Sequence, residues 1–125
     1  MGVRAIRGAI TVEKDTREEV ISATKLMLEE IIARNELAAE DIASMLFTTT
    51  EDVNSVFPAQ AARLLEGEDW AYVPLMCMRE IPVPGSLPMC VRVIMHVNTD
   101  KSAKEIQHVF LRDAVKLRPD LTNRS

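Results

Sequence analysis

The sequence predicts a single α+β domain in which a mixed β-sheet packs with one long and two short helices. Four apolar runs of strand length are separated by turn-forming residues, and one longer segment carries apolar residues at helical spacing. Two short segments carry the residues that start or end helices. The chain has 125 residues, of which 47% are hydrophobic, so it can bury one sizeable core.

The first strand is expected over residues 3–12 and ends near Glu13. Directly after it, Thr16 and Glu19 have the spacing of a capping box, in which a Ser or Thr and a Glu three residues later satisfy the first amides of a helix. Apolar residues then recur at helical spacing as far as Asn35, while charged residues take the other side. This amphipathic helix is therefore expected to lie against the sheet.

A short helical turn is expected at residues 40–41, and the apolar run 43–50 predicts a second, largely buried strand. With the first strand and the helix it forms a βαβ unit, whose two strands should be parallel. In segment 57–65, Pro58 stands where the first turn of a helix tolerates proline, and Gly67 follows where a helix ends. We therefore expect a short helix there.

The third strand is expected over residues 70–78, and Pro74 indicates an edge position because proline cannot donate to the hydrogen-bond ladder. Residues 81–88 hold too many prolines for regular structure and form a long turn into a fourth strand over residues 89–97. A second capping box at residues 102–105 predicts another short helix.

Charge and composition exclude several classes of function. The chain has a net charge of -4 and a pI near 5.2, which argues against binding of a nucleic-acid backbone. No signal segment or apolar stretch of membrane-spanning length is visible, so we expect a cytoplasmic protein without a membrane partner. There is no phosphate-binding glycine loop and no set of His, Cys and carboxylate residues at metal spacing, so neither a cofactor nor a metal is expected.

Four arginines, at positions 7, 63, 92 and 118, are the candidate functional residues. Arg7 and Arg92 lie inside apolar strands, where an arginine keeps its charge and is rarely buried without an anionic partner. One interpretation is that these arginines bind an anionic ligand. The other is that each strand arginine pairs with a carboxylate such as Glu80, that Arg63 lies on the polar side of its helix, and that Arg118 forms a salt bridge in the tail.

Five separated blocks carry a resemblance to a known family. They are residues 4–12 (RAIRGAITV), 56–63 (VFPAQAAR), 72–80 (YVPLMCMRE), 90–95 (CVRVIM) and 117–121 (LRPDL). In this order they resemble the small monofunctional chorismate mutases of the trimeric, pseudo-α/β-barrel class. The resemblance implies a homotrimer with one active site in each cleft between neighbouring subunits, and a single domain over residues 1–125.

The resemblance also implies a reaction and the residues that perform it. Chorismate rearranges to prephenate by a concerted [3,3] shift that moves no proton and needs no cofactor. By resemblance, Arg92 contacts the ether oxygen and one carboxylate, Arg7 anchors the other carboxylate, Glu80 accepts the ring hydroxyl and Cys77 donates near the ring. The implied substrate-binding residues are Phe57, Ala59, Gln60, Arg63, Leu75, Met76, Phe110, Leu117 and Arg118, the last on a tail that is mobile from about residue 112.

Two positions depart from the family pattern. Gln60 stands where better-known members have a lysine, and Phe110 stands where they have a tyrosine, so ground-state binding of the dianion is expected to weaken. Two other functions stay open at this point. One is a trimeric imine or enamine deaminase-like hydrolase, which must activate water, and the other is a non-catalytic sensor of small aromatic-pathway acids.

Overall fold

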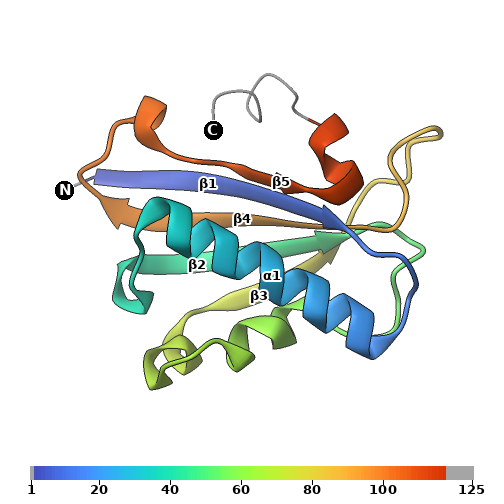
Figure 1. Ribbon diagram of the computed structural model, residues 1–125, viewed down its shortest axis with the longest axis horizontal. Coiled ribbons are helices and arrows are strands. Elements are labelled where there is room, and N and C mark those ends of the chain that lie inside the picture. The colour runs from blue at the N-terminus through green and yellow to red at the C-terminus, as the bar shows by residue number, and fades with distance from the viewer. Residues whose placement is uncertain (1, 118–125) are drawn as a thin grey trace.

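A computed structural model describes residues 2–117 of the chain, which form a five-stranded mixed sheet with the strand order β3-β2-β4-β1-β5. The strands are β1 (Gly2–Thr11), β2 (Ile42–Thr49), β3 (Leu75–Arg79), β4 (Cys90–Thr99) and β5 (Val109–Leu111). The long helix α1 (Arg17–Asn35) crosses one face of this sheet (Figure 1). The mixed sheet and the α+β class are therefore confirmed.

Helix α1 forms where the sequence predicts it. The Thr16 hydroxyl accepts a hydrogen bond from the Glu19 amide at 3.2 Å, which caps the helix as the Thr-x-x-Glu spacing requires. The Glu19 carboxylate does not close the box on Thr16 but accepts from the Glu13 amide at 2.8 Å. At the other end Glu36 adopts φ 54°, and its amide bonds back to the last turn. The helix therefore ends one residue before a left-handed position.

The strands β1 and β2 are parallel, as expected, but they are not neighbours. Strand β4 lies between them and pairs antiparallel with both, with Ala9 opposite Arg92 and Thr48 opposite Arg92 on its other side. Alternation along these central strands places their side chains on two faces of the sheet. The side against α1 holds the main core, which includes Ile6, Phe47 and Met95, each fully buried.

The third strand begins later than predicted. Residues 68–72 form the 3₁₀ helix η3 (Glu68–Tyr72), and β3 covers only Leu75–Arg79. The indole Nε1 of Trp70 donates to the Glu66 carbonyl at 2.9 Å, and this local bond favours a helical turn over the extended backbone that aromatic residues otherwise prefer. The predicted edge position is confirmed, with Pro74 just before the strand.

A fifth strand and the form of the short helices were missed. Strand β5 pairs in parallel with β1 through Gly8, Ala9 and Ile10. The predicted short helices are 3₁₀ helices: η1 (Ala39–Asp41), η2 (Pro58–Leu64) and η4 (Ala103–Glu105). A further one, η5 (Arg112–Lys116), follows β5. The sequence predicts a tail that is mobile from about residue 112, and this stays a prediction. Residues 112–116 form η5, and Arg118 lies outside the described residues.

The face of the sheet opposite α1, the open face, is covered by residues 2–117 only at one end. There η5 and Leu117 pack over Ala9, Cys90 and Phe110. Elsewhere Leu46 and Ile94 are half-buried, and Met76 and Met78 on β3 are 58% and 43% exposed. Among the described residues, no helix is long and apolar enough to cross a membrane.

Candidate active site

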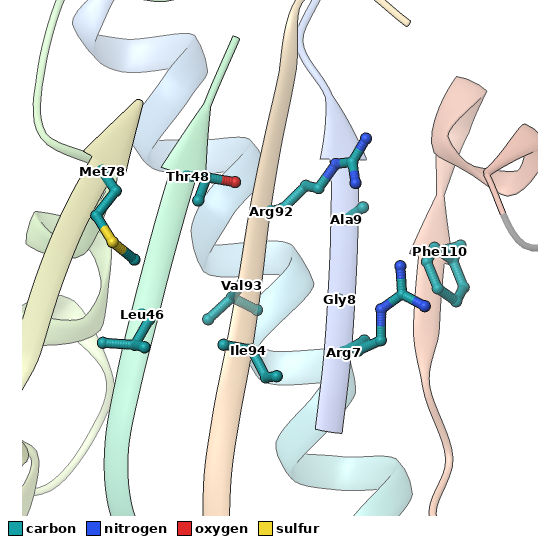
Figure 2. Close-up of a pocket in the computed structure, with 10 residues that line it drawn as sticks. All are labelled: Arg7, Gly8, Ala9, Leu46, Thr48, Met78, Arg92, Val93, Ile94 and Phe110. Carbon is teal, nitrogen blue, oxygen red and sulfur yellow. The ribbon is translucent and has the colours of Figure 1, made fainter. Parts of the chain in front are cut away.

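The two strand arginines lie together on the open face. In the pairing of β1 with β4, Ala9 stands opposite Arg92 and Arg7 opposite Ile94, so all four side chains emerge on the same side of the sheet. Figure 2 shows both guanidinium groups on the side away from α1, with that of Arg92 extending over Ala9. They line a cavity of about 160 Å³ whose other walls are Gly8, Ala9, Leu46, Thr48, Met78, Val93, Ile94 and Phe110.

Arg92 is held by Glu80, which follows the edge strand. Its Nε lies 3.2 Å from Glu80 Oε2 in an ion pair, although the two groups are not aligned as a hydrogen bond. The Thr48 hydroxyl donates to the same carboxylate oxygen at 2.7 Å. The Glu80 side chain is 18% exposed and that of Arg92 34%, and of the two only Arg92 lines the cavity. The pair that the sequence left open as an alternative therefore exists, and it fixes the direction of the guanidinium.

Arg7 is placed by β5, the strand that the sequence did not reveal. Its guanidinium carbon lies 5.7 Å from the centre of the Phe110 ring, and its backbone amide donates to His108 Nδ1 at 2.9 Å. Phe110 is 4% exposed. The ring thus supports the cation through its face, in the cation–π arrangement, where a tyrosine hydroxyl would instead add a donor.

A second group of predicted residues lies elsewhere, around η2 and the start of β3. A cavity of about 380 Å³ is lined by Phe57, Ala59, Gln60, Arg63, Leu75, Met76 and Cys77, which are all predicted substrate-binding or catalytic residues. Proline at the first position of η2 sets its direction, and the helix presents Gln60 and Arg63 to solvent. The structure therefore brings these seven residues together as one wall.

Strand β3 separates the two groups. Cys77 pairs with Phe47, whose side chain is fully buried on the α1 side, whereas Glu80 reaches Thr48 and Arg92 on the open face. Because successive side chains of a strand point to opposite faces, Cys77 and Glu80 cannot line one cleft from the same side of the sheet. Within one chain, the predicted site residues are therefore divided between two cavities, which we call half-sites.

Some positioning residues could not have been found from the sequence. The loop between β2 and η2, residues 50–57, carries Phe57 and is held by two side chains. Arg79 donates to the carbonyls of residues 50 and 53 at 2.7 and 3.1 Å, and Asp15 accepts from the amides of residues 54 and 55, each at 2.9 Å. No pattern in the sequence links these positions, since the partners lie 25 to 40 residues apart.

The surroundings of Cys90 do not favour a nucleophile. Burial raises the pKa of the Cys90 thiol to about 11, although the Arg92 guanidinium acts in the opposite direction. Cys90 is fully buried, so at neutral pH it is a protonated core residue. Cys77 is half-buried and free. Within residues 2–117 no group of His, Cys, Asp or Glu is arranged to hold a metal ion.

The open-face cavity provides fixed positive charge in apolar surroundings. Its lining residues include two guanidinium groups and one hydroxyl, but no carboxylate and no histidine. Such a site can bind an anion and stabilise negative charge that develops during a reaction, because the charges are preorganised and water is partly excluded. It offers no group for general acid–base transfer within the cavity itself.

Comparisons with known proteins agree on one family. The family model described as chorismate mutase type I matches residues 3–121. The chain is 50% identical over 122 residues to the chorismate mutase AroH of Bacillus subtilis (strain 168), covering 98% of this chain and 94% of that protein. It is 49% identical over 120 residues to the chorismate mutase AroH of Thermus thermophilus, covering 95% and 96% of the two chains.

The fold is also found among solved structures. A chorismate mutase from Clostridium thermocellum is similar with a TM-score of 0.85 and 50% sequence identity, over 89% of this chain and 96% of that chain. The similarity therefore extends over nearly the whole chain in both sequence and fold.

Proposed function

This chain belongs to the chorismate mutase type I family, and we propose that it acts through an active site completed by a second copy of the chain. It is a chorismate mutase, an isomerase of aromatic amino acid biosynthesis that converts chorismate to prephenate. The observation that carries the mechanism is the pair of guanidinium groups of Arg7 and Arg92 in one apolar cavity of the open face.

The reaction needs positive charge beside one oxygen. In the concerted [3,3] shift the ether C–O bond breaks while a new C–C bond forms, and negative charge develops on the ether oxygen. Arg92 stabilises this charge, and its fork also holds a carboxylate, which lysine could not do with the same geometry. In a closed cleft of effective dielectric near 20, a cation about 4 Å from a unit charge contributes about 4 kcal/mol.

The neighbouring residues hold the substrate in its compact, reactive shape. Arg7 anchors the second carboxylate, and Glu80 accepts the ring hydroxyl while its ion pair with Arg92 keeps the guanidinium in place. Restricting an extended molecule to the reactive conformer lowers the entropic part of the barrier without any proton transfer. No histidine lines the cavity, and the nearby Glu80 carboxylate is ion-paired with Arg92, which supports this mechanism over the activation of water by a deaminase.

The second wall comes from a neighbouring subunit. In one chain, Cys77 and Glu80 lie on opposite sides of β3, so the two half-sites can face one substrate only across an interface between two copies. The exposed Met76 and Met78 make the open face apolar enough to pack against another copy. These features support an interface between copies of the chain. With the family resemblance, we propose a cytoplasmic homotrimer that forms a pseudo-α/β barrel with three clefts, each closed by two subunits.

The remaining roles follow from this arrangement. Phe57, Ala59, Leu75 and Met76 supply the apolar wall, Cys77 donates near the ring, and Gln60 and Arg63 hold the outer carboxylate. Leu117 packs against the cluster that contains Phe110. Arg118, which lies outside the described residues, is an outer cation for the substrate, within the single domain of residues 1–125.

The activity is tested by following the loss of chorismate absorbance with the purified protein. Because no proton moves and arginine stays charged, kcat should be nearly constant from about pH 6 to 9 and show almost no solvent deuterium effect. A bell-shaped profile with a large solvent isotope effect would indicate an activated water and would contradict the mutase mechanism.

The shared cleft is tested by mixing two inactive variants. Arg92→Ala removes the catalytic cation from one half-site, and Arg63→Glu reverses a charge in the other. After unfolding and refolding together in equal amounts, about one quarter of the clefts should combine two intact half-sites and regain activity. If each half-site served only its own chain, the refolded mixture would stay as inactive as the two variants separately.

A further inference from the structure

A larger cleft adjoins the wall formed by η2. It has a volume of about 470 Å³ and shares Phe57, Gln60 and Cys77 with the wall described above. Two further cations line it, Arg17 at the start of α1 and Arg79 at the end of β3. The family resemblance assigns neither of them a role.

Arg79 is occupied within the protein. Its guanidinium donates to the Thr49 hydroxyl, to the carbonyls of Thr50 and Val53 and to the Asn54 side-chain oxygen, at 2.7 to 3.1 Å. An arginine has five donor hydrogens, so these contacts use most of its capacity. Arg79 therefore holds the loop 50–57 and has little left for a ligand.

Arg17 is in the opposite situation. Its Nη1 donates to Gln60 Oε1 at 2.9 Å, and it takes part in none of the ion pairs found among residues 2–117. Most of its donors therefore face an exposed cleft. A neutral amide holds the side chain in place without neutralising its charge.

The position of Arg17 is unfavourable for the helix that carries it. It is the first residue of α1, where the aligned peptide dipoles leave partial positive charge, so a cation there weakens the helix. The neighbouring Glu18 and Glu19 carry the negative charge that favours a helix N-terminus, whereas Arg17 carries the opposite charge. A residue that breaks a local rule without a compensating contact in the protein is a candidate for a functional role.

We propose that Arg17 is a substrate-binding cation that supplies, from α1, the positive charge that position 60 lacks. This inference rests on the proposed function. Gln60 becomes a positioning residue: its oxygen accepts from Arg17, which leaves its NH₂ group to donate to the same carboxylate. The charge acts at the outer wall, away from the ether oxygen, so it strengthens binding of the dianion without changing the chemical step.

The hydrogen bond between Arg17 and Gln60 changes the effect that a lysine at position 60 should have on substrate binding. In the native chain, Gln60→Lys would place two cations side by side and break the hydrogen bond to Arg17, so it should improve binding little. In an Arg17→Gln background the same lysine should restore the missing charge. The two positions are therefore expected to be coupled rather than additive.

The experiment compares Arg17→Gln with Arg34→Gln in steady-state kinetics with chorismate. Both variants lose one positive charge from α1, but Arg34 pairs with Glu30 at the other end, about 25 Å away. For an exposed cation, Arg17→Gln should raise KM about three- to fivefold with kcat unchanged, and Arg34→Gln should leave both constants as they are. The difference should shrink at 1 M salt, where the Debye length falls to about 3 Å.

Two further variants separate charge from structure. Arg17→Lys should keep KM close to the wild-type value, and Arg17→Gln/Gln60→Lys should recover it. The melting temperature of Arg17→Gln should be equal to or above that of the wild type, because a cation is removed from the helix N-terminus.

An unchanged KM in Arg17→Gln, or an equal rise in Arg34→Gln, would overturn the role of Arg17. A fall in kcat together with the melting temperature would do the same, because it would show a structural role. These results differ from failure of the proposed function, in which the wild-type protein itself would leave chorismate unconverted.

Discussion

At the scale of single residues, Arg92 has an ion-pair partner in the protein, Glu80, and another in the proposed complex, the substrate. In the free protein it pairs with Glu80 at 3.2 Å, as an ordinary strand arginine would. What distinguishes it is that Arg92 lines an apolar cavity together with Arg7, and that Glu80 also accepts a hydrogen bond from Thr48. We propose that the ion pair orients the guanidinium for a ligand, and mutation separates this role from a purely structural one.

Arg92→Ala should reduce kcat by at least 10²- to 10³-fold, about 2.7 to 4 kcal/mol, because one preorganised donor to a developing oxyanion is lost. Replacing Arg92 by citrulline keeps the planar shape and removes the charge, so a similar loss would assign the effect to electrostatics. Stopped-flow or steady-state assays with chorismate measure kcat for both variants. The variants should stay folded by circular dichroism, since the Arg92 side chain is 34% exposed.

A kcat above about one tenth of the wild-type value in Arg92→Ala would instead mean that the ion pair with Glu80 is the whole role of this arginine.

At the scale of elements, the approach of α1 to β1 depends on one glycine. A Cβ built on Gly8 would lie 2.6 Å from Ile31 Cδ1, 3.1 Å from Val93 Cγ1 and 3.3 Å from Met27 Cγ. All three side chains are buried in the main core, so none can move freely. Gly8 is therefore needed for close packing of α1 on the sheet. It follows Arg7 in the strand and, like Arg7, lines the open-face cavity.

Gly8→Ala should destabilise the protein by about 1–3 kcal/mol through overpacking of this contact. Urea unfolding followed by circular dichroism measures the change. Gly2→Ala is the matched control in the same strand, because nothing lies within 4 Å of its added Cβ. Equal midpoints for the two variants would show that α1 can shift away from β1 without cost.

The loop 50–57 depends on a carboxylate outside it. Although partial burial acts in the opposite direction, hydrogen bonds from Ser55 and Asn54 lower the pKa of Asp15 below 3.8. A depressed folded-state pKa means that the ionised group stabilises the fold above pH 3.8 and that this stabilisation is lost as the pH falls through the lower value. The loop that carries Phe57 should therefore loosen in acid.

Asp15→Asn should lower the free energy of unfolding by about 1 kcal/mol at pH 7, because one of its two accepting oxygens is lost and the site is exposed to solvent. The difference from wild type should shrink as the pH falls below 3.8. Urea titrations of both proteins at pH 7 and at about pH 3 measure it. A difference that is the same at both pH values would mean that the charge of Asp15 does not hold the loop.

At the scale of the whole molecule, residues 2–117 form no full layer over one side of the sheet. Helix α1 covers the other side (Figure 1), while η5 and Leu117 cover only the end of the open face near Cys90. The rest of it includes Leu46, Ile94 and the exposed Met76 and Met78, beside Arg7 and Arg92. A sheet with one bare apolar face gains stability by packing against another sheet, here that of a second copy.

Leu46→Asp should dissociate the proposed trimer, because a carboxylate on the half-buried open face would be desolvated in the interface. Sedimentation velocity at micromolar concentration should show the mass of one chain, 14.0 kDa, with native circular dichroism. Leu26→Asp, on the exposed side of α1, is the control and should leave the trimer intact. A trimer that survives Leu46→Asp would place the interface on another surface.

Local patterns in the sequence determined the elements that depend on neighbouring residues. Helix α1 with its Thr16 cap, the strands β1, β2 and β4 and the turn over residues 81–88 follow from spacing and turn chemistry alone. The same patterns singled out Arg7 and Arg92. Where a local bond competed with propensity, as for Trp70 and Glu66, the boundary of β3 was misplaced.

Only the tertiary structure decided which of these residues meet. Strand β5 has three residues and exists because it pairs with β1 about 100 residues earlier, so no local signal marks it. Alternation along β1 puts Arg7 on the other face of the strand from Ile6 and Gly8. It does not determine which strand lies beside β1 or in which register the two strands pair. Register put Arg7 and Arg92 on one face, because hydrogen-bond pairing between distant strands is a long-range property of the chain.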